Sequence, residues 1–373
     1  MQRQRIVVGM SGGVDSSVAA LRLLEAGHDV HGLYMSNWEE DEEGYCQSAA
    51  DFQDALAVCE LLRIPLHRVS FAREYRELVF QQFLDGYRAG ITPNPDVLCN
   101  REIKFGSFAA HAGRLGAERI ATGHYARTDG ARLLRAADAN KDQTYFLHAV
   151  DHDALARTVF PIGELDKTEV RAIARSGGLP NHDRSDSTGI CFIGERPFAE
   201  FLARYLPAEP GNIETPDGHC IGTHRGLAYY TLGQRQGLHI GGVAGRDEGP
   251  WYVARKDAAR NVLVAVQGHD HPLLLSRRLI AVEPHWIAGT APALPRTCTA
   301  RTRYRQPDRP CRVEAGQDGG LAVTFEFPQR AVTPGQYVVF YEGEVCLGGA
   351  TIAATEPLDD LRVSADGVAA ASA

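Results

Sequence analysis

Three short stretches of this 373-residue chain combine residue types that can do chemistry. In the first, residues 11–17 (Ser-Gly-Gly-Val-Asp-Ser-Ser) follow the apolar run Ile6–Val8 and precede apolar residues at helical spacing over 18–24. Gly12 and Gly13 have no Cβ, so the backbone there can bend sharply and turn its N–H groups toward an anion. A following helix would add its positive N-terminal end. The pattern predicts a phosphate-binding loop, with an ordinary strand–turn–helix as the alternative interpretation.

The second stretch, residues 92–105, places a carboxylate and a thiol three positions apart. Two prolines stiffen the chain around Asn94, and Asn94 or Asp96 can cap a helix that follows. Asp96 and Cys99 then share one helix face. The helix dipole stabilises a thiolate in the first turn, whereas Asp96 opposes it, so the direction of the pKa shift stays open. The pair is either an acid–base group beside a reactive thiol or a capping Asp with a buried Cys.

The third stretch, residues 186–194, holds Cys191 in a short apolar run bracketed by Gly189 and Gly194. Burial is one interpretation, and a thiol on a loop hinged at the two glycines is the other.

The elements that must position these groups alternate between strands and helices over residues 1–198. We expect strands at 6–8, 29–35, 65–71 and 119–124, and helices at 48–63, near 74–88 and after the capping box at 166–169. Such alternation predicts an α/β domain with a doubly wound parallel sheet. Ligands bind outside the carboxyl ends of its strands, where the loop, Met35 and Gly123–His124 fall. Met35 has an equal claim to be a core residue.

After residue 199 the pattern changes to short β segments. An amphipathic helix at 197–206 and glycine-rich strands to 270 predict a small β-rich central module, and six strands over 271–358 predict a C-terminal β-barrel. In that barrel Arg301, Arg303 and Arg305 alternate, with Tyr304 between them. This pattern predicts a one-faced RNA contact, with a solvated sheet face as the alternative. Residues 359–373 are expected to be a disordered tail.

Composition narrows the class of protein. The net charge of −8 argues against a general nucleic-acid coat but allows a local basic face. No apolar run reaches the ~20 residues of a membrane span, and Met1–Arg5 begins no signal peptide, so we expect a cytoplasmic protein. The eight cysteines show no Cys-x-x-Cys spacing, so a zinc site is not expected. The acidic run 39–43 is interpreted as a solvated loop rather than a metal site.

Several strings, taken in order, resemble the bacterial tRNA-specific 2-thiouridylases of the AMP-forming ATP pyrophosphatase superfamily. They are the Ser-Gly-Gly-Val-Asp-Ser loop, Asn94–Asn100, Gly123–Tyr125, Lys141–Gln143, Gly189–Gly194, Tyr230–Arg235 and Thr333–Gln336. The resemblance covers almost the whole chain. It implies a pyrophosphate-loop ATPase fold, with an ATP-binding catalytic domain at 1–198, a central adaptor at 199–270 and a tRNA-binding barrel at 271–358.

The family's activity implies a reaction on the anticodon loop of tRNA. The wobble uridine is adenylated at its 2-carbonyl, and Cys191 carries a persulfide whose terminal sulfur attacks the activated carbon or is first released as sulfide. Cys99 attacks Cys191 to leave a transient Cys99–Cys191 disulfide, with Asp96 as acid–base group. ATP with Mg²⁺ and a persulfide donor (a cysteine desulfurase or relay protein) are implied. An alternative is another pyrophosphatase-type ligase or amidotransferase acting on a small substrate, and a further one is a non-catalytic RNA-binding protein.

The resemblance also implies the residues of the site. Those for ATP are Gly9, Met10, Ser11, Gly12, Gly13, Val14, Asp15, Ser16, Met35 and Gly123. Those for the target base and the tRNA, with the arginine pattern added, are Asn94, Pro95, Asp96, His124, Lys141, Asp142, Gln143, Arg303, Tyr304 and Gln336.

Overall fold

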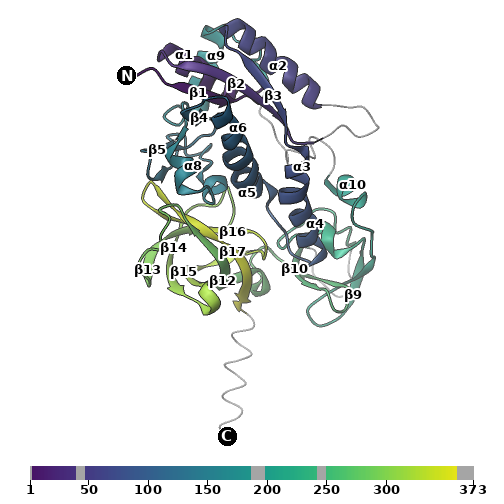
Figure 1. Cartoon of the computed structure of the whole chain (residues 1–373). Coiled ribbons are helices and arrows are strands. Elements are labelled where there is room, and N and C mark those ends of the chain that lie inside the picture. Colours follow the sequence, from purple (N-terminus) through teal and green to yellow (C-terminus); the bar gives the residue numbers. More distant parts are fainter. Residues whose placement is uncertain (1, 39–46, 186–197, 242–248, 359–373) are drawn as a thin grey trace.

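The computed structural model describes residues 2–38, 47–185, 198–241 and 249–358. Three β-sheets in three stretches of the chain organise it (Figure 1). The expected fold class is confirmed: a parallel sheet with helices comes first, a small β-rich module follows, and a closed antiparallel barrel lies at the C-terminal end.

The first sheet is parallel throughout, in the strand order β3-β2-β1-β4-β7. Its strands are β1 (Arg5–Gly9), β2 (Asp29–Ser36), β3 (Leu66–Ser70), β4 (Arg119–Ala121) and β7 (Thr158–Val159). The apolar run predicted at 6–8 is the central strand, buried on both faces, because successive side chains of a strand point to opposite sides. Chain order reverses between β1 and β4, the place where such sheets bind ligands.

Helices cover both faces of this sheet. On one face, the core that contains Ile6 and Val8 includes residues of α1 (Val14–Glu25), α2 (Gln47–Leu62) and α9 (Lys167–Ser176). On the other face, the core that contains Val7 includes residues of α3 (Ala72–Tyr75), α4 (Gln81–Arg88) and α6 (Phe108–Arg114). The predicted capping box of α9 is present, with Asp166 and Glu169 bonding reciprocally.

Two long helical segments, here called rods, contain π-helical turns that the sequence periodicity did not predict. One rod runs from α3 through η1 (Arg76–Phe80) to α4. The other begins with Asn94, whose side chain accepts from the N–H of Asp96 at 3.2 Å, as predicted for a cap. It continues as α5 (Pro95–Leu98), the π-helix η2 (Cys99–Ser107) and α6. π-Helical turns interrupt α-helices most often at functional sites, and η2 begins at Cys99.

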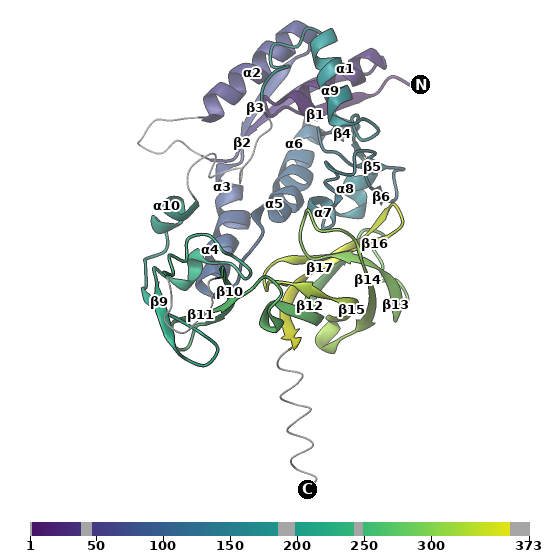
Figure 2. The ribbon, with the colours of Figure 1, turned by 180° about the vertical axis from the view of Figure 1, so that it is seen from behind.

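The central module is a four-stranded sheet that follows α10 (Phe198–Ala203). Its order is β10-β11-β8-β9, formed by β8 (Gly211–Glu214), β9 (Cys220–His224), β10 (Trp251–Asp257) and β11 (Val262–Gln267). Lys256 of β10 donates to the carbonyl of Gly90, just past α4, at 3.2 Å. The module is therefore joined to the helical layer of the first domain (Figure 2).

The barrel closes in the order β12-β15-β14-β13-β16-β17, with β17 returning to pair with β12. Its strands are β12 (Leu275–Trp286), β13 (Arg296–Arg301), β14 (Arg309–Ala315), β15 (Leu321–Arg330), β16 (Tyr337–Glu342) and β17 (Val345–Pro357). The hairpin predicted around 131–136 forms as β5 (Arg127–Thr128) and β6 (Leu133–Leu134), and β6 pairs with β17. The first domain thus adds two strands to the barrel sheet.

Shorter helices complete the chain: α7 (Thr144–Leu147), α8 (His152–Ala156) and the 3₁₀ turns η3 (Leu227–Tyr229), η4 (Pro272–Leu274) and η5 (Gln317–Gly319). Within the described residues, no helix combines the length and the apolar character needed to span a membrane.

Candidate active site

The loop between β1 and α1 is folded by its own serines. The Ser16 hydroxyl accepts from the N–H of Ser11 at 3.2 Å and donates to the carbonyl of Gly13 at 3.0 Å, and Ser17 donates to the same carbonyl at 2.9 Å. Gly12 has φ +79°, and a Cβ there would overlap the backbone carbonyl of Asp51 in α2. The predicted strand–loop–helix is therefore present, with a glycine at a position that no larger residue fits.

The end of β4 packs directly against this loop. A Cβ on Gly123 would lie 2.6 Å from the backbone nitrogen of Ser16, so this close approach requires glycine. The side chains of Met10 and Val14 are buried in the core, which leaves their backbone atoms as the groups to offer a phosphate. Met35, at the end of β2, is partly buried against the other core.

A cation that the sequence analysis did not select lies beside the loop. Lys167 Nζ is 2.7 Å from Asp15 Oδ1 and 2.9 Å from Oδ2, and Tyr125 Oη donates to the same carboxylate at 2.9 Å. Lys167 belongs to the capping-box string and had been interpreted only as the start of a helix. Because α9 begins there, its ammonium group lies at the phosphate loop.

Two further residues that the sequence analysis did not select, Asn181 and Arg184, contact the phosphate loop. The buried Asn181 donates through Nδ2 to the carbonyl of Gly12 at 2.7 Å and to Ser17 Oγ at 3.0 Å. Arg184 donates to the Gly12 carbonyl at 3.3 Å and forms ion pairs with Asp51 and Asp54 of α2. Burial raises the pKa of the Asp51 carboxyl, although the hydrogen bond from Arg184 opposes the shift. Cys191 lies outside the described residues.

Asp96 and Cys99 lie where the second rod begins. Cys99 is buried. Burial raises the pKa of the partly buried Asp96 carboxyl, and the positive charge of Lys104 opposes that shift. A carboxyl with a raised pKa can exchange a proton closer to neutral pH than an ordinary aspartate does.

The same rod is connected to the phosphate loop by two consecutive residues at the end of β4, Gly123 and His124. Lys104 Nζ lies 3.4 Å from His124 Nε2, and the preceding Gly123 touches α1. The other ring nitrogen of His124 is 2.8 Å from Thr122 Oγ1, and the ring lies near Phe105 and Phe160. Burial, and then Lys104, hold the pKa of His124 well below its usual range. His124 is therefore a neutral, buried ring within this contact path.

The Lys141–Gln143 string occupies the boundary between the first domain and the barrel. Asp142, almost fully buried, accepts from Thr144 and forms ion pairs with Arg135 at 3.2 Å and Arg301 at 3.4 Å. Gln143 exchanges hydrogen bonds with the backbone of Tyr125, at 2.8 and 2.9 Å. Lys141 is partly buried. Asp142 thus has a structural role here, and its predicted tRNA contact stays a prediction.

The predicted one-faced arginine stripe is wrong, because β13 ends at Arg301 and the following residues turn. Arg301 points inward and pairs with Asp308 at 2.5 Å, in addition to Asp142. Arg303 donates to the carbonyls of Leu232 at 2.9 Å and Ala331 at 2.8 Å. Burial, and then Arg330, lower the pKa of Arg303.

The neighbours of these arginines also bridge the domains. The Tyr304 ring lies 4.4 Å from that of Phe146 in the first domain, whereas Arg305 is exposed. Gln336 of the barrel donates to the carbonyl of Thr92 at 2.7 Å, two residues before Asn94. Gln336 therefore braces the backbone that leads into Asn94, Pro95 and Asp96.

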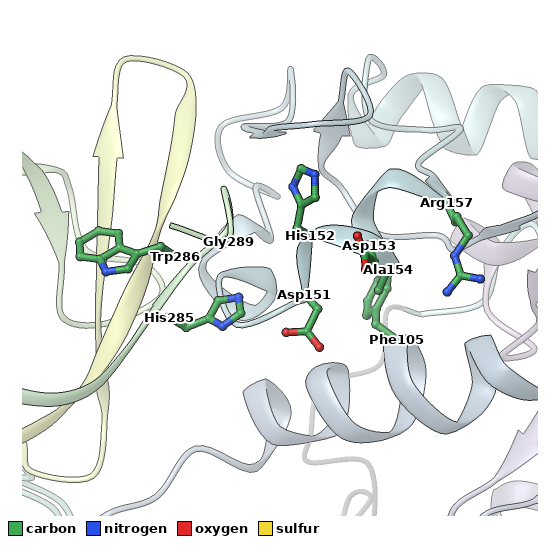
Figure 3. A pocket seen from close by; sticks show the side chains of 9 residues that line it. All are labelled: Phe105, Asp151, His152, Asp153, Ala154, Arg157, His285, Trp286 and Gly289. Carbon is green, nitrogen blue, oxygen red and sulfur yellow. The ribbon is translucent and has the colours of Figure 1, made fainter. Parts of the chain in front are cut away.

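A cavity of about 520 Å³ lies elsewhere, between α8 and the end of β12. Figure 3 shows Asp151 of the first domain and His285 of the barrel directed toward the same space. Its lining does not include the phosphate loop. We place the candidate site at the loop rather than in this cavity, because backbone N–H groups bind phosphate at an open helix N-terminus without an enclosed pocket.

The parallel sheet with helices on both faces defines an α/β domain, and a family model of such a domain matches the same part of the chain. Residues 4–195 match the tRNA methyl transferase HUP domain, 199–267 the PRC-barrel domain of that family, and 276–352 an aminomethyltransferase β-barrel domain. The likeness to solved structures is weak: the U34-tRNA thiolase NcsA from Methanococcus maripaludis gives a TM-score of 0.33 at 20% identity, covering 55% of this chain and 67% of that chain.

Curated relatives are far more similar. The tRNA-specific 2-thiouridylase MnmA of Alcanivorax borkumensis is 60% identical over 358 residues, which are 95% of this chain and 98% of the relative. The protein of the same name from Stenotrophomonas maltophilia is 58% identical, over 96% of both chains. The chain belongs to the tRNA-specific 2-thiouridylase family.

Proposed function

We propose that this protein catalyses the ATP-dependent 2-thiolation of the wobble uridine of tRNA. It is a tRNA sulfurtransferase, because relatives that match almost the whole chain are named tRNA-specific 2-thiouridylase. The observation that carries the proposal is the contact path from Lys104 through His124 and Gly123 to the phosphate loop. That path joins the rod with Asp96 and Cys99 to the loop that would receive the phosphates of ATP.

In the activation step, the N–H groups of residues 9–16 would bind the phosphates of ATP, with the base near Met35 and Gly123. Lys167 adds positive charge at the loop, held in place by Asp15 and Tyr125. The uridine 2-carbonyl oxygen attacks the α-phosphorus and pyrophosphate leaves. Mg²⁺ would offset phosphate charge. The Asp15 carboxylate belongs to the loop, and no three His, Cys, Asp or Glu groups of the described residues gather as a metal site.

Asn94, Pro95 and Asp96 would hold the flipped-out base. We assign the acid–base role to Asp96, because its raised pKa lets it take up the proton that the base loses on adenylation. His124 would not exchange this proton itself, since burial keeps it neutral. Its role in the proposal is to hold Lys104, and with it the rod, against the end of β4.

In the sulfur step, the terminal sulfur of a Cys191 persulfide attacks the activated carbon and AMP leaves. The Cys99 thiolate then attacks Cys191 Sγ, which releases the sulfur to the base and leaves a Cys99–Cys191 disulfide. An external thiol would reduce that disulfide. The persulfide would come from a cysteine desulfurase or a relay protein in the cytoplasm, and the barrel at 271–358 would contribute to tRNA binding.

The decisive experiment analyses the nucleosides of tRNA after incubation with the protein, ATP and a persulfide source. Mass spectrometry should detect 2-thiouridine at the wobble position, together with AMP and pyrophosphate. Cys191→Ser should abolish the product and Asp96→Asn should reduce it strongly. The absence of 2-thiouridine, or pyrophosphate release that does not depend on tRNA, would reject the proposal.

A further inference from the structure

Two cysteines that the proposed reaction does not use face each other in the barrel. Cys298 of β13 is directly opposite Cys311 of β14 in the antiparallel register, and their Sγ atoms are 3.8 Å apart. Cys311 is buried in the barrel core, whereas Cys298 is partly exposed. One thiol is therefore open to a small reagent, and the second lies within reach behind it.

The surroundings make the two thiols unequal. The hydrogen bond with Cys311 lowers the pKa of the Cys298 thiol and the positive charge of Arg296 acts in the same direction, while burial and the negative charge of Glu342 oppose them. The hydrogen bond with Cys298 and burial raise the pKa of Cys311. Elsewhere, burial alone raises the pKa of Cys59 to about 12. Cys298 thus has the greater thiolate character, which governs reactivity toward oxidants.

The segment between these cysteines docks the barrel on the first domain. Within it, Arg301 pairs with Asp142, and Tyr304 packs against Phe146. Asp308 pairs with Arg135 at 2.6 Å. Cys298 and Cys311 therefore lie on the two strands that flank a loop, and residues of this docking loop make the contacts between the domains.

We propose that Cys298 and Cys311 are a redox-active dithiol that peroxide converts to a cross-strand disulfide closing this docking loop. The Cys298 thiolate attacks one peroxide oxygen, the O–O bond breaks, and hydroxide leaves with the proton that Cys298 gave up, as water. The Cys311 sulfur then attacks the sulfenic acid, the S–O bond breaks, and a second water leaves with the Cys311 proton. Overall, two thiols and one hydrogen peroxide give one disulfide and two waters.

The strand pairing suits this bond. Directly paired residues of antiparallel strands have Cα atoms about 4.5–5.5 Å apart, within the range of about 4.4–6.8 Å that disulfides span. The sulfur atoms need to approach from 3.8 Å to about 2.05 Å, which side-chain rotation supplies while the strands remain paired. Closing the loop restricts the unfolded chain, so the oxidised protein should be more stable than the reduced one.

The test treats the reduced full-length protein with hydrogen peroxide, blocks free thiols, and digests it with trypsin without reductant. The Arg309–Pro310 bond resists trypsin, so the expected product is a disulfide-linked pair of the peptides Thr297–Arg301 and Gln306–Arg312. The thermal midpoint should rise by several degrees and return after reduction. Neither measurement uses ATP or tRNA, so the outcome is independent of the proposed function.

Matched variants decide the assignment. Cys298→Ser and Cys311→Ser should each abolish the linked peptides and the rise in thermal midpoint, whereas Cys220→Ser, at an exposed cysteine of the central module, should retain both. Oxidation of Cys298 to sulfinic acid while Cys311 remains a free thiol would overturn the proposal.

Discussion

Polar side chains lie close together in both the phosphate loop and the arginine-rich docking loop of the barrel. Their hydrogen-bond partners differ: they are neighbours in sequence in the first loop and distant residues in the second. In the phosphate loop, Ser11, Gly13 and Ser16 bond one another within a few positions. In the docking loop, Arg301 finds Asp142, which is 159 positions away, and Asp308 finds Arg135, which is 173 positions away. Hydrogen bonds between neighbouring residues shape the phosphate loop, whereas ion pairs with distant residues let the docking loop join two domains.

This difference teaches where a basic cluster can mislead. A buried guanidinium needs carboxylates or carbonyls around it: Arg301 pairs with Asp308 and Asp142, and Arg303 donates to the carbonyls of Leu232 and Ala331. A run of arginines in a barrel therefore predicts an RNA contact only when those arginines do not form ion pairs with distant acidic residues. The variants below test both halves of this contrast.

The largest effect is expected from Gly12→Val in the phosphate loop. Gly12 has φ +79° and a side chain there overlaps the Asp51 carbonyl, so the loop must move. We expect pyrophosphate release to fall at least about 100-fold, the scale of losing a pre-organised anion site. Gly27→Val is the control, because Gly27 has φ +84° but nothing within 4 Å of an added Cβ. Equal losses in both variants would mean that backbone strain, rather than the loop, is responsible.

Asp142→Asn should act mainly on stability. It removes one of the two carboxylates, Asp142 and Asp308, that Arg135 and Arg301 share, and both arginine side chains are only 14% exposed. Because Asp308 still pairs with both arginines, the loss should stay below the cost of an abolished buried pair, about 3–5 kcal/mol, and is to be measured by urea unfolding. Asp129→Asn, which removes an exposed pair with Arg132, should leave the urea midpoint almost unchanged. Unchanged stability with weaker tRNA binding would instead make Asp142 a direct RNA contact.

Arg305→Ala and Arg303→Ala should separate surface charge from domain anchoring. Arg305 is exposed, so its loss should lower the salt slope of tRNA binding by about one charge and leave stability unchanged. Arg303 donates to two backbone carbonyls, so its loss should reduce stability by about 1–3 kcal/mol. Binding isotherms at several salt concentrations and urea unfolding measure the two effects. The opposite pattern would restore Arg303 as an RNA contact.

The smallest effect is a shift in pH dependence. Lys104 lowers the pKa of Asp96, so Lys104→Met should let that pKa rise further, and the acidic limb of the kcat/KM profile should move to higher pH. Nucleoside product formation, followed across pH with saturating ATP, measures the shift. Lys104→Arg keeps the charge and should keep the profile. A limb that moves to lower pH would remove Asp96 from the acid–base role.

The sequence by itself determined the features that depend on neighbouring residues. The phosphate loop, the Asn94 cap and the α9 capping box follow from φ preferences and hydrogen bonds within a few positions. The alternation of strands and helices predicted the parallel sheet for the same reason. The resemblance of whole strings to one family supplied the chemistry that no single string implies.

Only the tertiary structure decided which distant groups meet. Lys167 joins Asp15, and Arg184 reaches the carbonyl of Gly12, through packing that periodicity does not encode. Arg303 turns inward for the same kind of reason: its guanidinium donates to the carbonyl of Leu232 in the central module and to that of Ala331, just after β15. Burial and distant partners set the direction in which a charged side chain points, and both depend on the complete fold.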